Sequence, residues 1–146
     1  MVNGEDTKMA KMITHESALK AIEVGAAKAR ELGEPSSLAI VDVGGNLMAF
    51  LRVDDAALST VEIAQSKAYT ALALRSPSGN WLEIVQPGAA LYGLDALGGR
   101  RPFVVFGGGL PVYDGKTVVG GVGVSGGPAD ADVAIAEVMV SALQQH

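Results

Sequence analysis

The stretch FGGGLPVYDGKTVVGGVGVSGG, residues 106–127, threads glycine through runs of valine and other apolar residues. Glycine permits positive φ and lets other atoms approach the backbone closely, but it costs roughly 0.5–1 kcal/mol in a regular element. So many glycines need a reason, and two are open. They shape tight turns and bulges, or they form a backbone-lined floor on which a ligand or a neighbouring subunit rests.

The pattern of this stretch and of its surroundings predicts an antiparallel sheet. Strands are expected over residues 38–43, 47–53, 103–106, 111–113 and 117–124. The first two are joined by a Gly-Gly-Asn turn and the last two by the Asp114-Gly115 turn. Because hairpin-length connections dominate, we expect an antiparallel sheet with helices packed on it, which makes this an α+β protein.

Three helices are expected, over residues 14–33, 59–76 and 128–143. Thr14 is a good N-cap for the first helix, and Gly33 is placed to end it. Ser59 and Glu62 have the spacing of a capping box at the start of the second. Residues 78–102 lose this periodicity, apart from a short helix or strand at 81–85, and a loop this long is usually functional or an interface.

Length and composition indicate one domain with apolar surface to spare. The chain has 146 residues, of which 49% are hydrophobic but only 5% aromatic. The core is therefore built from alanine, valine, leucine and isoleucine, which suggests tight backbone packing. Such a composition also suggests further apolar surface that a homo-oligomer would bury. We expect residues 1–11 to form a flexible lead and residues 12–146 a single domain.

Several classes of function are excluded by composition. A net charge of −5 without a cluster of basic residues argues against nucleic acid as a partner. The absence of cysteine removes thiol catalysis, disulfides and thiolate metal sites, and two histidines cannot build a multi-histidine metal site within one chain. No stretch approaches the ~20 apolar residues of a membrane span, and no signal peptide is visible, so we expect a cytoplasmic protein.

The glycine-rich stretch matches neither common nucleotide-binding motif. A phosphate-binding loop leads from a strand through Gly-Lys-Ser/Thr into a helix, whereas Gly107-Gly108-Gly109 runs into Leu-Pro and another strand. No βαβ unit surrounds it, as a dinucleotide-binding motif would require. Ser125 lies outside a Gly-x-Ser-x-Gly elbow, which argues against serine hydrolase chemistry.

Charged residues on the hairpin and on the second helix have two interpretations each. Asp42, Arg52 and Asp54 either cap turns and form surface ion pairs, or Asp42 and Arg52, on paired strands, orient a polar ligand. Lys67 lies midway along an otherwise alanine-rich helix. It is either a surface lysine with its stem along the helix or a cation beside the loop or an anionic ligand group.

Four segments, read together, resemble the GlcG/HbpS-like family of haem-binding and haem-degrading proteins, which is also met as the C-terminal domain of PduO-type cobalamin adenosyltransferases. They are AIVDVGGNLMAFLRVD (39–54), IAQSKAYTA (63–71), QPG with LYG (86–88 and 91–93), and residues 106–127. The match runs in order from Met12 onward. It implies a profilin-like fold, with a five-stranded antiparallel sheet flanked by helices, and assembly into dimers up to octamers. It also implies that haem or another small ligand binds at the glycine-rich strands and the long loop, and that members accompany catabolic operons.

Haem, as the implied cofactor, directs attention to a few side chains. His15 is the well-placed imidazole and therefore the conventional histidine ligand for haem iron, although a histidine at a helix start is usually a surface residue. Tyr92 and Tyr113 could serve as phenolate ligands or general acids, or simply pack. Arg100 and Arg101 could meet carboxylates such as haem propionates, or pair with a partner subunit.

Three functions follow as hypotheses. In the first, an oligomeric small-ligand-binding or haem-binding protein is accessory to a catabolic pathway, with the glycines as floor, the loop as lid and basic residues as the anion-binding edge. Its expected ligand-binding residues are Arg52, Lys67, Tyr92, Arg101, Gly107, Gly108, Gly109 and Pro111. In the second, an enzyme acts on a small oxygenated anionic substrate by acid–base chemistry of Asp42, Asp54, Lys67 or Tyr92. In the third, the protein is a structural partner of another enzyme.

Overall fold

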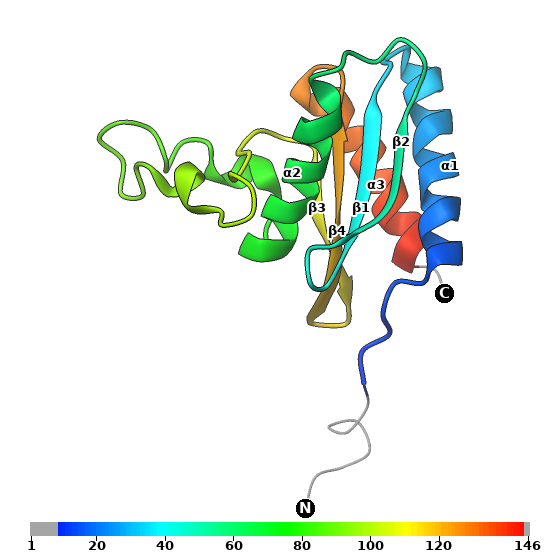
Figure 1. The fold of residues 1–146 in the computed structure, drawn as a ribbon, viewed down its shortest axis with the longest axis horizontal. Helices are drawn as coiled ribbons and strands as arrows, with labels where there is room; N and C mark the ends of the chain where they lie inside the picture. The colour runs from blue at the N-terminus through cyan, green and yellow to red at the C-terminus, as the bar shows by residue number, and fades with distance from the viewer. Residues whose placement is uncertain (1–8, 145–146) are drawn as a thin grey trace, which may run out of the picture.

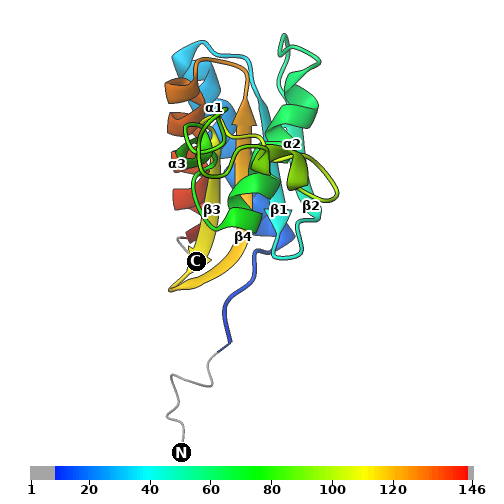
Figure 2. The same cartoon turned by 90° about the vertical axis from the view of Figure 1, so that its left-hand side faces the viewer.

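A computed structural model describes residues 9–144. They form three layers, in which one sheet lies between helices on both of its faces (Figure 1). Helices α1 (His15–Leu32) and α3 (Ala129–Gln144) cover one face, and α2 (Thr60–Leu74) covers the other, as the turned view in Figure 2 also shows. The sheet consists of β1 (Ser37–Asp42), β2 (Leu47–Arg52), β3 (Gly109–Asp114) and β4 (Thr117–Ser125). The predicted α+β class is confirmed.

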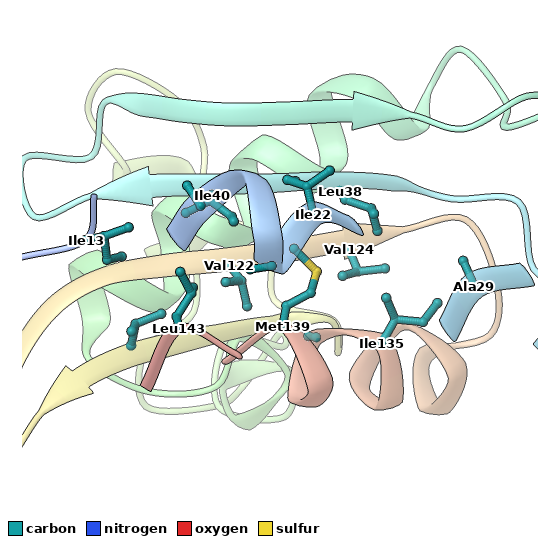
Figure 3. Close-up of a cluster of buried hydrophobic side chains, with 14 of the residues drawn as sticks. Ile13, Ile22, Ala29, Leu38, Ile40, Val122, Val124, Ile135, Met139 and Leu143 are labelled. Atoms are coloured by element: carbon teal, nitrogen blue, oxygen red, sulfur yellow. The ribbon is translucent and has the colours of Figure 1, made fainter. Parts of the chain in front are cut away.

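Every neighbouring pair in the sheet is antiparallel, and the strand order is β2-β1-β4-β3. Along β1, Leu38 and Ile40 face the core under α1 and α3, whereas Ala39 and Val41 face α2. This alternation follows from the two-residue period of a strand. Figure 3 shows the larger core, where Val122 of β4 lies among side chains from β1, α1 and α3.

The sheet of the described residues has four strands, so the predicted strand over 103–106 is wrong. This segment makes its hydrogen bonds outside the sheet: the Val104 amide donates to the Thr70 hydroxyl on α2 at 2.9 Å, and the Phe103 amide donates to the Asp95 carbonyl. Valine and phenylalanine favour a strand, but the amides of Phe103 and Val104 bond to the loop and to α2 instead of to a neighbouring strand. The strand propensity of residues 103–106 is therefore overridden by tertiary contacts, because the end of the loop packs on α2.

The predicted caps of α1 are confirmed, whereas the predicted capping box of α2 is not. Thr14 accepts the Ser17 amide at 3.1 Å, and Gly33 ends α1 with φ +68°, as predicted. The predicted capping box of Ser59 is wrong, because Ser59 already has helical backbone angles and its side chain makes no cap bond. The hydroxyl of Thr60 instead donates to the Ala57 carbonyl and bonds to Ser37.

The glycines of β3 and β4 allow α2 to lie directly on the sheet. A Cβ atom on Gly123 would lie 1.9 Å from the Ala64 carbonyl oxygen, and one on Gly121 would lie 2.4 Å from that of Ala68. Val122 and Val124 of the same strand face the opposite core. The backbone of Gly121 and Gly123 is therefore closely approached, but by the chain's own helix α2 rather than by a ligand or a neighbouring subunit.

The segment between α2 and β3 projects from the body (Figure 1). It holds two short 3₁₀ helices, Ser78–Trp81 and Leu94–Leu97, and returns along α2. No helix of the described residues is long and apolar enough to cross a membrane. Residues 1–8 of the predicted flexible lead lie outside the described part, while the Lys11 amide donates to Asp114 and Ile13 packs in the core.

Candidate functional site

A cavity of about 430 Å³ lies where the β1–β2 turn, α2 and the end of the projecting loop meet. We call it the arginine pocket, and its lining includes Gly45, Asn46, Leu47, Gln65, Tyr69, Arg100 and Arg101. Its volume is that of an ordinary small-molecule site. Two guanidinium groups in one cavity make it a candidate for an anionic ligand.

Arg100 is held in place by neutral partners. Its guanidinium donates to the Asn46 side-chain oxygen at 3.0 Å and to the Gly44 carbonyl oxygen. It also lies over the ring of Tyr69, 5.4 Å from the ring centroid. Among residues 9–144 no carboxylate lies within ion-pair distance of Arg100. Its positive charge is thus fixed in position without a counter-charge.

Arg101 has a different set of partners. It donates to the Ser66 hydroxyl at 2.9 Å and pairs with the Glu62 carboxylate at 3.1 Å. Glu62 is exposed, and exposed pairs of this kind contribute little to stability. The two adjacent arginines therefore tie the loop to two different elements, Arg100 to the hairpin turn and Arg101 to α2.

The turn residue Gly45 makes the approach of Arg100 possible. Its φ is +79°, and a Cβ atom there would lie 2.4 Å from a terminal nitrogen of Arg100 and 3.2 Å from the Tyr69 ring. A side chain at this position would fill the pocket entrance as well as strain the turn. The Gly-Gly-Asn turn was recognised from sequence as a turn, but its contact with a residue 55 positions away was not.

A second cluster, the buried pair, consists of Lys67 on α2 and Asp132 on α3. Lys67 is 2% exposed and Asp132 3% exposed, and their charged groups are 3.1 Å apart. Lys67 also donates to the Val124 carbonyl at 2.8 Å and lies 5.8 Å from the ring centroid of Phe106. The interpretation of Lys67 as a surface lysine is therefore wrong.

Burial acts on both charges of the pair. It lowers the pKa of Lys67 and raises the pKa of Asp132, while the attraction between them opposes both shifts. Asp132 also accepts the Gly127 amide at 3.0 Å, which secures the start of α3. Asp132 was missed by sequence reasoning, although it lies on the buried stripe of α3 with Ile135 and Met139. An acid on an apolar stripe was the available signal.

The predicted ligand floor, Gly107–Gly109, lies beside this pair. A Cβ atom on Gly108, where φ is +127°, would lie 2.9 Å from the Lys67 ammonium nitrogen, and one on Gly109 would lie 2.3 Å from the Lys67 carbonyl oxygen. Gly107 and Pro111 are half-buried. The space above Gly108 and Gly109 is thus filled by the same chain, and their ligand-binding role stays a prediction.

The charged residues of the hairpin do not converge. Asp42 accepts the amides of Gly44 and Asn46, both at 2.9 Å, and so caps the turn. Arg52 pairs in register with Ser37 at the other end of β1, about 17 Å along the strand from Asp42. The two cannot orient one small ligand together.

The other acid–base candidates are also dispersed. Asp54 is exposed and lines a separate cavity beside the end of α1, and Tyr92 is 69% exposed on the loop. Within residues 9–144 no hydrogen bond or ion pair joins any two of Asp42, Asp54, Lys67 and Tyr92. Their catalytic role stays a prediction.

The possible iron ligands lie at the surface. The side chain of His15 is 76% exposed and its Nε2 lies 2.9 Å from a Glu16 oxygen. The Tyr113 hydroxyl instead donates to the Arg75 carbonyl. In the part of the chain that the structure describes, no three potential ligands gather to form a metal site. A haem iron needs only one such axial ligand, since the porphyrin supplies four.

Comparison with known proteins gives consistent matches along the chain. The model of a family described as "Haem degrading protein HbpS-like" matches residues 13–141. An uncharacterized 15.0 kDa protein from the dhaT–dhaS intergenic region of Citrobacter freundii is 41% identical over 133 residues, which are 91% of this chain and 93% of that protein.

Two solved structures share both fold and sequence with the chain. The Klebsiella pneumoniae protein ORFY, of the DUF336 family, has a TM-score of 0.89 at 32% identity and is covered over 99% of its length by 100% of this chain. The PduOC:heme complex has a TM-score of 0.84 at 34% identity, with 90% of this chain and 95% of that chain covered.

Proposed function

Because the chain belongs to the HbpS-like family of haem-degrading proteins, we propose that it is an oligomeric cytoplasmic small-ligand-binding protein that takes haem and is accessory to a catabolic pathway. The observation that carries this proposal is the likeness to the PduOC:heme complex over 95% of that chain. A likeness of this extent supports the proposal, because two chains with the same fold present corresponding surfaces. The ligand itself depends on individual side chains, which must be tested against this chain.

The start of α1 carries the side chains that we propose for contact with a haem. His15 presents an exposed imidazole, and Leu19, one helical turn further along the same face, is exposed as well. An imidazole beside exposed apolar surface suits a porphyrin, whose ring is apolar and whose iron takes a histidine ligand. We assign His15 as the residue that would hold the iron.

Each of these side chains has a separate task in holding the group. Haem, when bound, supplies a redox-active iron. Because His15 Nε2 lies 2.9 Å from a Glu16 carboxylate oxygen, which would accept a hydrogen bond from it and orient the ring, His15 would offer Nδ1 to the iron. Leu19 would contribute apolar contact with the porphyrin.

A titration with haemin tests the proposal. We expect the wild-type protein to develop a shifted Soret band in ultraviolet–visible spectra, and His15→Ala to bind at least about tenfold more weakly, because loss of outer partners of metal ligands alone costs about 10–100-fold. Tyr92→Phe is the matched control, since it removes the hydroxyl of an exposed alternative ligand. We expect its spectrum and affinity to match the wild type.

Two results would contradict parts of this assignment. A wild-type protein without a Soret shift would overturn haem as the ligand. If the Soret shift were unchanged in His15→Ala but lost in Tyr92→Phe, the iron ligand would be Tyr92 of the loop rather than His15.

The proposed oligomer is supported by the surface of the projecting loop. Leu82, Ile84, Leu91, Tyr92 and Leu97 are all exposed there. Apolar surface gathered on one segment is typical of an interface. A second copy of the chain would remove these side chains from water.

We expect Leu97→Glu to shift the protein towards smaller assemblies in native mass spectrometry, because a charge buried at an interface without a partner is costly. Leu58→Glu is a closely matched control, since both leucines are 74% exposed and Leu58 lies before α2 rather than on the loop. Equal distributions of assemblies for the two variants would contradict a loop interface.

A further inference from the structure

We propose that the arginine pocket binds a small aliphatic monocarboxylate, whose carboxylate lies on Arg100 and whose hydrocarbon chain lies along Leu47. This site is separate from the haem assignment and does not depend on it. It involves neither His15 nor any residue given to the iron.

Arg100 is exposed and pairs with no carboxylate among residues 9–144, so the pocket can accept one negative group. Arg101 is already paired with Glu62, and the carboxylate of Asp42 is occupied by two amides of the turn. Arg100 is left with carbonyl oxygens and an aromatic ring, none of which cancels its charge. A single carboxylate would neutralise it.

The guanidinium is prepared for such a partner. It has five N–H groups, of which two donate to Asn46 and Gly44. Three therefore remain, and Arg–carboxylate pairs commonly use two parallel bonds. The existing bonds and the Tyr69 ring hold the group still, so little side-chain freedom is lost when a ligand arrives.

Most of the lining side chains are polar, and Leu47 gives the pocket one accessible apolar side chain that the hydrocarbon part of a ligand can contact. Leu47 is half-exposed at its edge, and Val41 lies behind it. The side-chain amide nitrogen of Asn46 donates to no other residue in the described chain and is free for the second carboxylate oxygen. One fixed cation, one amide donor and an apolar wall together match a short fatty-acid anion.

Titration of ¹⁵N-labelled full-length protein with sodium butyrate tests this inference. We expect saturable shifts at the amides of Gly45, Asn46 and Leu47, and Arg100→Gln should weaken binding by about 10–100-fold, the usual effect of losing a hydrogen bond to a charged group. The affinity of Arg100→Lys for butyrate should lie between those of the wild type and of Arg100→Gln, because lysine keeps the positive charge but not the planar guanidinium. Lys20→Gln, an exposed change of equal charge on α1, should bind as the wild type.

Leu47→Ala tests the apolar contact with the ligand and leaves the hydrogen bonds of Arg100 to Asn46 and Gly44 in place. Butyrate should bind the wild type more tightly than acetate, by at most about 15-fold for two further methylenes, and this preference should shrink in Leu47→Ala. The comparison remains valid if Arg100→Gln loosens the loop.

Several outcomes would overturn the inference. These are the absence of shifts at the turn, an affinity that does not respond to Arg100→Gln, inorganic phosphate binding as tightly as butyrate, or succinate binding more tightly. A protein that binds butyrate but not haemin would overturn the proposed function alone, and the reverse result would overturn only this site.

Discussion

Lys67→Met is expected to lower the free energy of unfolding by about 3–5 kcal/mol, the range seen when one partner of a buried ion pair is removed. Methionine fills much the same space, so packing is largely kept. Within residues 9–144, Lys67 is the one cation paired with the carboxylate of Asp132, which is 3% exposed. The substitution removes that cation and its hydrogen bond to the Val124 carbonyl. Urea denaturation followed by circular dichroism measures the change.

The matched variant is Lys67→Met combined with Asp132→Asn. Asparagine keeps an oxygen for the Gly127 amide but carries no charge, so the double variant should recover most of the loss. If the double variant is as unstable as Lys67→Met, the unpaired charge is not the cause.

The same reasoning predicts a pH dependence. Burial already raises the pKa of Asp132, and the attraction of Lys67 opposes that shift. Without Lys67 the folded-state pKa lies further above the unfolded value. A group of this kind adds stability below its unfolded pKa and loses it as pH rises through its folded pKa. The stability of Lys67→Met should therefore rise as pH falls from neutral towards the ordinary carboxyl range, whereas the double variant should lack this response.

Gly123→Ala is expected to cost at least about 3 kcal/mol, the upper end of the usual overpacking range. Its Cβ would lie 1.9 Å from the Ala64 carbonyl oxygen and 2.5 Å from the Ala68 amide nitrogen. Both are backbone atoms of α2, and β4 is held between β1 and β3. Neither side can yield by rotating a side chain, so the helix must move off the sheet.

Gly44→Ala is the control for this change. Its Cβ would meet only the side chains of Asn46, at 2.9 Å, and Asp42, at 3.4 Å, in an exposed turn, and its φ is not positive. We expect a change near the ±0.5 kcal/mol typical of surface positions. Thermal and urea unfolding of the two variants side by side test the prediction, and similar losses at both positions would show that the glycines of β4 are not contact points for α2.

Much of the fold could be predicted from local pattern. The caps of α1, the β1–β2 hairpin and the long irregular loop follow from residue types and their spacing over a few positions. The errors arose where local pattern and packing disagreed. Residues 103–106 have strand-forming side chains but lie beside α2, and Ser59 has the right partner for a capping box but already belongs to the helical turn.

The candidate sites could be predicted only in part. Lys67 and Arg101 were singled out from the sequence as cations near the loop, but the carboxylate beside Lys67 and the hairpin turn beside Arg100 were not. Asp132 is 65 residues from Lys67, and Asn46 is 54 residues from Arg100. No spacing rule connects positions so far apart, because their contact depends on how α2, α3 and the loop return to the sheet.

In the glycine-rich stretch, residues 106–127, one part of the structure follows from the local sequence and another only from tertiary contacts. Residue types alone predicted strands within this stretch but left two explanations for its glycines, namely tight turns and bulges or a backbone surface that something else contacts. That α2, rather than a ligand, lies on Gly121 and Gly123 became clear only from the folded chain. Conformational preference is a property of a few neighbouring residues, whereas burial, charge pairing and the occupant of a surface arise from contacts between distant segments.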